Sequence, residues 1–139
     1  MNTKLNYPPK VLLAWTEAVG GNAKIRDWLI QHGYKELGIF CFALRNKASA
    51  RQWLLENKFP HLLALINGVE GNLSAIKWLD RYGFKVLAKV ALAGDSNEEA
   101  YRWLVDLDLK VMALLAKKIE YVKLDIEEKN NDIHRFNPD

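Results

Sequence analysis

The sequence predicts an all-α protein, an α-solenoid of four and a half helix–turn–helix repeats. Three observations predict it: tryptophans recur every 25 residues, apolar residues within each repeat have helical spacing, and Gly, Asn and Pro separate the helices. The tryptophans are Trp28, Trp53, Trp78 and Trp103, and each is followed by leucine. A fixed period of about 20–50 residues is the signature of stacked repeats, each of which buries its apolar face against its neighbours.

The first helix of each repeat contains the tryptophan. In the first full repeat Ile25, Trp28, Leu29 and His32 follow the i, i+3, i+4, i+7 spacing of one helix face. Gly33 follows them, where a helix needs a residue of left-handed conformation at its C-terminal end. The pattern predicts a helix of about 11 residues that ends in a tight turn.

Residues that favour helix ends mark the boundaries between the helices. Asn22 and Asn72 are expected as N-caps, since their side chains can accept from free backbone N–H groups. Ser96 and Glu99 have the spacing of a capping box. Pro60 stands at the expected start of a second helix, where its missing N–H matters least.

The second helix of each repeat is shorter and more apolar. Leu37, Phe40, Cys41 and Leu44 have the spacing of one helix face over about 10 residues. Cys41 shares its repeat position with isoleucine and alanine, so we expect a small buried apolar residue rather than a nucleophile.

The period divides the chain into one domain with two caps. A half repeat opens the array, and a longer, polar-faced capping helix from about 110 to 129 closes it, which gives about nine helices. The expected units are a half repeat over 9–20, repeats over 21–45, 46–70, 71–95 and 96–129, together a single domain over 1–129, and a flexible C-terminal tail over 130–139.

The tryptophans are expected to form the structural core between repeats rather than a platform for stacking a ligand. Each lies on the same predicted face as its apolar neighbours, and burial of an indole ring removes a large apolar area from water. The residues expected in this core are Trp15, Trp28, Trp53, Trp78 and Trp103.

Composition narrows the class of protein. The chain has 139 residues and one cysteine, so no disulfide can form within it. No apolar stretch reaches the ~18–20 residues of a membrane helix, and the first residues lack the apolar core of a signal peptide. These features predict a cytoplasmic protein that does not span a membrane. Residues 1–94 hold 13 Lys/Arg against 6 Asp/Glu, whereas residues 95–139 hold 7 against 11.

No catalytic, metal-binding or cofactor-binding motif stands out. The three histidines, His32, His61 and His134, include no pair at the i, i+4 spacing of a helical metal site. Gly20-Gly21-Asn22 precedes a helix but lacks the form of a phosphate-binding loop, and is better explained as a turn. We therefore expect neither an enzyme nor a bound cofactor or metal.

At the level of architecture the chain resembles the α-solenoid repeat proteins, such as the HEAT-like, ankyrin and leucine-rich-repeat-variant groups. The run from Ala75 to Gly83 resembles the second helix of an ankyrin repeat. The period differs from the ankyrin period of about 33 residues, and no functional residue carries over. The resemblance implies only that such an array binds a partner along one surface.

Two features could serve binding. Lys10, Lys35, Lys85 and Lys110 share one repeat position at the start of the second helix, while Phe42 and Leu92 add apolar surface beyond the core positions. These lysines could instead bond the free carbonyls of the preceding helix, and the apolar residues could be packed within the solenoid. We expect a protein partner, or a second copy, on the face lined by the second helices. The alternative is binding of nucleic acid or another phosphate backbone through the basic residues of 1–94.

Overall fold

The computed structural model describes residues 5–136, and the side chains of residues 5–131. The described part is all-helical, which confirms the predicted fold class. Its nine helices are α1 (Pro9–Val19), α2 (Ala23–Gln31), α3 (Lys35–Leu44), α4 (Ala48–Glu56), α5 (Pro60–Val69), α6 (Leu73–Arg81), α7 (Lys85–Gly94), α8 (Glu98–Asp106) and α9 (Lys110–Phe136).

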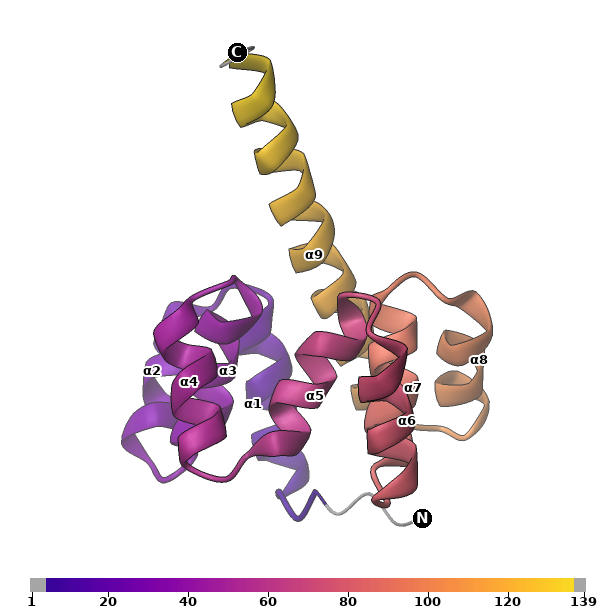
Figure 1. Ribbon diagram of the computed structural model, residues 1–139. Helices are drawn as coiled ribbons and strands as arrows, with labels where there is room; N and C mark the ends of the chain where they lie inside the picture. Colours follow the sequence, from indigo (N-terminus) through magenta and orange to yellow (C-terminus); the bar gives the residue numbers. More distant parts are fainter. Residues whose placement is uncertain (1–4, 137–139) are drawn as a thin grey trace.

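The helices form an inner and an outer layer. The inner helices are α1, α3, α5, α7 and α9, and each contacts the next inner helix along the chain. The outer helices are α2, α4, α6 and α8, and each contacts the inner helix before it and the one after it. Short turns reverse the chain at every step, so all five inner helices run in the same direction (Figure 1).

The two ends of the array meet. Helix α9 contacts α1 as well as α7, and the five inner helices therefore form a closed ring (Figure 1). Arg45, just after α3, also pairs with Asp125 of α9 at 3.1 Å. The predicted caps exist, but each covers the other instead of an open end. This closure removes the exposed terminal faces that a solenoid would otherwise leave to solvent.

The backbone of the turns repeats with the same period as the sequence. Every turn contains one residue of positive φ, and these residues lie 25 apart in two series: Gly21, Asn46, Gly71 and Ser96, then Gly33, Lys58, Gly83 and Asp108. Glycine adopts this conformation at least cost, whereas other residues are strained in it. The expectation for Gly33 is therefore confirmed, and the same turn forms in the repeats that lack glycine.

The helix starts agree with the sequence with one exception, but the first helices of the repeats have 9 residues, whereas the pattern predicted about 11. Asn22 and Asn72 accept from the N–H groups of Ile25 and Ala75, as predicted, and Pro60 is the first residue of α5. The predicted capping box at Ser96 is wrong. Asn97 is the N-cap of α8 and accepts from the Ala100 N–H at 2.9 Å, because Ser96 is the turn residue of positive φ.

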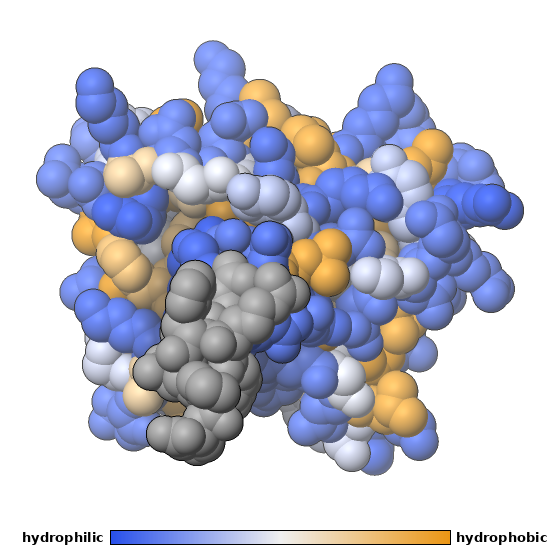
Figure 2. Space-filling model, turned by 90° about the horizontal axis from the view of Figure 1, so that it is seen from above, coloured by the Kyte–Doolittle hydropathy of each residue, from blue (hydrophilic) through white to orange (hydrophobic). Residues whose placement is uncertain are grey.

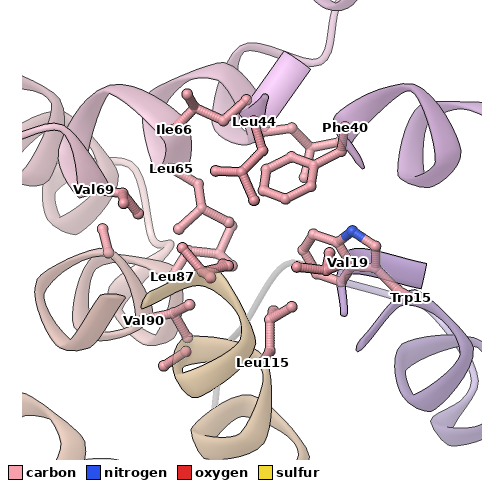
Figure 3. Packing of buried hydrophobic residues seen from close by; sticks show 14 of the residues in the cluster. Trp15, Val19, Phe40, Leu44, Leu65, Ile66, Val69, Leu87, Val90 and Leu115 are labelled. Atoms are coloured by element: carbon pink, nitrogen blue, oxygen red, sulfur yellow. The ribbon is translucent and has the colours of Figure 1, made fainter. Parts of the chain in front are cut away.

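The centre of the ring is filled by side chains from all five inner helices (Figure 3). Trp15 of α1 is fully buried there and meets the Phe40 ring edge-on, with 5.1 Å between ring centroids. The Trp15 Nε1–H has no hydrogen-bond partner among the described atoms, and it lies on the side of the indole that faces Phe40 (Figure 3). An N–H directed at an aromatic ring is a weak but favourable contact.

Close approach between helices depends on Gly68 in α5. A Cβ atom at this position would lie 2.7 Å from Ile76 Cδ1 of α6 and 2.9 Å from Ala91 Cβ of α7. These distances are shorter than carbon atoms tolerate, so glycine permits the contact of α5 with both neighbours.

The tryptophans of the outer helices lie at the edge of the core instead of inside it, and Trp53, Trp78 and Trp103 pack against its buried residues. Trp28 is 45% exposed, and its three equivalents, Trp53, Trp78 and Trp103, are only half-buried. The fully buried column is the leucine that follows each tryptophan: Leu29, Leu54, Leu79 and Leu104. Neighbouring residues on a helix point about 100° apart, so only one of the two can face the ring squarely. Trp15 alone of the predicted five lies in the core.

Helix α9 continues past its predicted end near residue 129 and ends at Phe136. Residues 130–136 are therefore helical instead of a flexible tail, while 137–139 lie outside the described residues. Beyond the ring the helix projects from the body (Figure 1). Within the described residues, no helix combines the length and the apolar character needed to cross a membrane.

Candidate interaction grooves on the outer face

The predicted binding face, lined by the second helices of the repeats, lies mostly inside the ring. The outer edges of α3 and α5 reach the surface, where each forms the floor of a groove beside the next outer helix. Ile39, Phe42 and Leu63 are half-buried at these edges, whereas Val86 is fully buried. Most of the extra apolar surface of the inner helices is therefore covered by packing on several sides.

One groove brings two of the predicted partner-binding residues together. The α3–α4 groove has a volume of about 310 Å³ and is lined by Lys35, Ile39, Phe42, Lys47, Ser49, Ala50 and Trp53. Helix α3 provides the floor with Ile39 and Phe42, and α4 provides a wall with Trp53. The groove thus combines an apolar, aromatic interior with a lysine at each end of its α3 side.

Three cationic side chains surround the aromatic rings of the α3–α4 groove. The Arg26 guanidinium of α2 lies 4.5 Å from the Phe42 ring centroid, and Lys47 Nζ lies 5.1 Å from the same centroid. Lys35 Nζ lies 5.2 Å from the Trp53 ring centroid. Attraction between a cation and a ring face holds these groups at the groove. Asp27 pairs with Arg26 Nε at 3.3 Å, which leaves the two lysines as the less neutralised charges.

Lys47 occupies a position that asparagine holds in the other repeats. Asn22, Asn72 and Asn97 cap α2, α6 and α8 with their side chains, whereas Lys47 precedes α4 and makes no cap hydrogen bond. Loss of an asparagine cap costs about 0.5–2 kcal/mol. A residue that breaks a local rule of stability at one repeat only is a signal of function, because such departures concentrate at functional sites.

The equivalent groove of the next repeat has the same shape and a different lining. The α5–α6 groove has a volume of about 300 Å³ and is also walled by a tryptophan, Trp78. Its lining residues are all uncharged: Pro60, Leu63, Ala64, Asn67, Asn72, Ser74, Ala75 and Trp78. Pro60 and Asn72 stand where the α3–α4 groove has Lys35 and Lys47, so the two grooves differ mainly in charge.

Lys85 and Leu92, two further predicted partner-binding residues, lie together between α6 and α7. They line a hollow of about 250 Å³ that also contains Lys77, Lys89 and Asp80. Lys85 and Lys89 also approach the Trp103 ring, at 5.8 and 5.4 Å from its centroid. This region is basic like the α3–α4 groove, but it has an acid in its lining.

The remaining two lysines of the predicted column do not join a groove. Lys10 and Lys110 are exposed at the starts of α1 and α9, where the ring closes. Lys110 Nζ lies 3.6 Å from Asp108 Oδ1, and both side chains are exposed to solvent. The four lysines therefore lie at the same end of the ring. Among them, Lys35 contacts the Trp53 ring and Lys85 contacts the Trp103 ring.

Three titratable side chains of the described residues, Cys41, His61 and His32, take part in packing or ring stacking. Burial raises the pKa of the Cys41 thiol to about 12, so the group stays protonated at neutral pH. The Cys41 thiol donates to the Leu37 carbonyl, which agrees with the expected packing role. Burial lowers the pKa of His61, whose ring stacks on Phe84 at 4.9 Å between centroids. His32 is exposed and stacks on Trp28 at 4.5 Å.

Among the residues whose side chains are described, no three His, Cys, Asp or Glu side chains lie close enough to hold a metal ion. Seen from the end where α9 projects, the surface is mainly hydrophilic, with hydrophobic residues in small separate areas (Figure 2). The described surface also has a hollow of about 210 Å³ between α9 and the ends of α3 and α5, which is lined by Leu44, Asn46, Val69, Glu70, Lys123, Ile126 and Glu127.

Sequence reasoning identified Lys35 and Phe42 but missed Arg26, Lys47 and Trp53 as part of the same site. When the repeats are aligned at their 25-residue period, one position holds asparagine in three repeats and lysine, Lys47, in the fourth. This difference was the signal in the sequence that could have identified Lys47. Comparison of the chain with models of protein families, with curated proteins and with solved structures found no match.

Proposed function

We propose that the chain is a non-enzymatic protein–protein interaction module that binds an acidic, partly apolar segment of its partner in the α3–α4 groove. The observation that carries this proposal is Lys47, which replaces a helix cap with a cation only at this groove. An apolar side chain of the partner would contact Ile39 and Phe42, and a carboxylate beside it would pair with Lys35 and Lys47. Charged residues at the edge of an apolar contact set specificity and the rate of association.

A synthetic peptide tests this proposal. The probe is a fluorescein-labelled helical peptide of about 15 residues, with a leucine followed at i+3 and i+4 by glutamates. We expect the fluorescence anisotropy to show saturable binding, which the double variant Lys35→Glu/Lys47→Glu weakens about tenfold or more. The same peptide with lysines in place of the glutamates should not bind.

The matched control is Lys10→Glu/Lys110→Glu, which makes the same change of net charge away from the groove. We expect it to change the affinity by less than about threefold, because exposed charges beyond a Debye length are screened. Equal weakening by both double variants would mean that the peptide responds to the overall charge, and the groove would be rejected as the site.

Binding to a phosphate backbone is the second candidate function, and it is favoured by the same cations together with the half-buried Trp53 ring beside Lys35. Bases stack on exposed aromatic rings while lysines contact phosphates. A labelled single-stranded oligonucleotide, titrated at about 50 and 200 mM salt, distinguishes the two functions. Binding that falls steeply with salt and is lost in Lys35→Glu/Lys47→Glu would favour nucleic acid over an acidic peptide.

A further inference from the structure

The projecting part of α9 has an exposed face of its own. The buried residues Leu115, Ile119 and Val122 hold the first turns of the helix in the ring. On the opposite side of the same stretch, Tyr121 is 61% exposed and Leu124 is 50% exposed. Beyond them the helix continues away from the body (Figure 1).

This exposed face is acidic as well as apolar. Tyr121, Leu124 and Glu128 follow the i, i+3, i+7 spacing of one helix face, whereas Glu127 lines a hollow against the ends of α3 and α5. Glu127 and Glu128 are exposed, and neither forms an ion pair with a described residue. The lysines nearby have other partners: Lys123 pairs with Asp95, and Lys129, next to Glu128, pairs with Asp125. We call the face formed by Tyr121, Leu124 and Glu128 the α9 stripe.

The α9 stripe complements the α3–α4 groove in both chemistry and size. Leu124 with a glutamate at i+4 presents an apolar group next to a carboxylate, and the groove presents Phe42 next to Lys35 and Lys47. The volume of about 310 Å³ suits one or two such side chains rather than a whole helix. Charge, apolar character and extent therefore agree between the two surfaces.

The stripe cannot reach the groove of its own chain. Asp125 pairs with Arg45, and Lys123 pairs with Asp95, so the base of the projection is fixed to the ring at two points. The helix then continues outward without a break, away from the outward-facing wall between α3 and α4 (Figure 1). An occupant with this chemistry must come from another molecule.

We infer that the α3–α4 groove binds the α9 stripe of a second copy of the chain. The inference rests on the proposed function, because it names the partner of the same groove. Each copy offers one stripe and one groove on different surfaces, so the contact is heterologous and further copies can add head to tail. A contact of one groove and about two helical turns is small, so the assembly is weak and depends on concentration.

Sedimentation of the full chain from about 10 µM to 1 mM, at low salt, tests the inference in the range expected for a small contact. We expect the average mass of the wild type to rise with concentration past twice the monomer mass, and to fall back when salt is raised. The variants Lys35→Glu/Lys47→Glu and Leu124→Lys/Glu128→Lys should each sediment as monomers. All these positions are at the surface, and thermal unfolding checks that both variants stay folded.

Mixing the two variants gives the decisive result. One retains an intact stripe and the other an intact groove, so an equimolar mixture should form a one-to-one dimer and nothing larger. The matched control, Asp106→Lys/Leu107→Lys, replaces an acidic residue and a leucine at the end of α8, changes the net charge by the same amount and should assemble like the wild type.

A wild-type chain that remains monomeric at the highest concentration would overturn the inference. So would a mixture that gives no dimer. If the acidic peptide still binds the groove in either case, the proposed function stands and only the identity of the partner is rejected. If the peptide also fails to bind, both are rejected.

Discussion

Each outer helix has one side that faces the ring and one side that faces solvent, and the residues on both sides repeat every 25 positions. The inward column is leucine in all four helices, and each of these leucines is fully buried. The outward tryptophan is equally regular, yet it is partly exposed in every repeat. Around it the residues vary, from Lys35 and Lys47 at one groove to Pro60 and Asn72 at the next.

This difference separates stability from recognition within one repeat. Inward positions have to fill a closed ring, and close-packed interiors tolerate little change of volume. Outward positions have solvent on one side, so their charge can change from groove to groove without loss of the fold. The tryptophan forms one wall of both grooves, while the other lining residues differ between them. The α3–α4 groove has a lysine at the start of α3, Lys35, and a second lysine at the N-cap position of α4, Lys47.

The largest expected effect compares Leu29 with Trp28, its neighbour on α2. Leu29→Ala removes a fully buried side chain, so we expect the free energy of unfolding to fall by about 2–5 kcal/mol. Trp28→Ala removes a larger side chain that is 45% exposed, and we expect a loss of about 1 kcal/mol. Urea denaturation of both variants measures the two values. A loss for Trp28→Ala equal to that for Leu29→Ala would show that the outward column is part of the core.

A smaller effect is expected for Lys47→Asn, which gives α4 the cap that α2, α6 and α8 have. The variant should unfold at a higher urea concentration, with a gain of about 1 kcal/mol, because the asparagine side chain can accept from a free N–H of the first turn. The same change removes one cation from the groove and should weaken binding of the acidic peptide. Lower affinity in a more stable protein cannot result from unfolding, so the pair of measurements assigns Lys47 to binding. A stabilised variant with unchanged affinity would remove Lys47 from the site.

Much of the fold was predictable because it depends on contacts within one repeat. The helix starts at Asn22, Pro60 and Asn72 follow from local hydrogen bonding and backbone geometry, which the residue types themselves determine. Ring closure was not predictable in this way. It depends on the small rotation between successive repeats, which accumulates over the array and is set by side-chain packing rather than by any single residue. The extension of α9 to Phe136 was missed because its polar residues lack a clear stop signal.

The candidate site was only half predictable for a related reason. Lys35 and Phe42 were recognised from their repeat positions, but their partners Arg26 and Trp53 come from the preceding and following outer helices. Which outer helices flank an inner helix is a property of the layers, not of the period. Trp53 was assigned to the core because the spacing of apolar residues shows which side chains share one face of a helix. It does not show how much of that face is buried.

The closed ring is the central claim, since it places the inner helices inside and leaves binding to the outward grooves and α9. The most direct test is the distance between α1 and α9, measured by pulsed electron paramagnetic resonance with spin labels at the exposed positions Leu13 and Leu114, in a Cys41→Ala background. Adjacent helices lie about 8–10 Å apart, so the ring predicts a label distance below about 25 Å. An open array of four repeats would separate the same labels by roughly 40 Å. The longer distance would contradict the ring and would return the binding surface to the face lined by the inner helices.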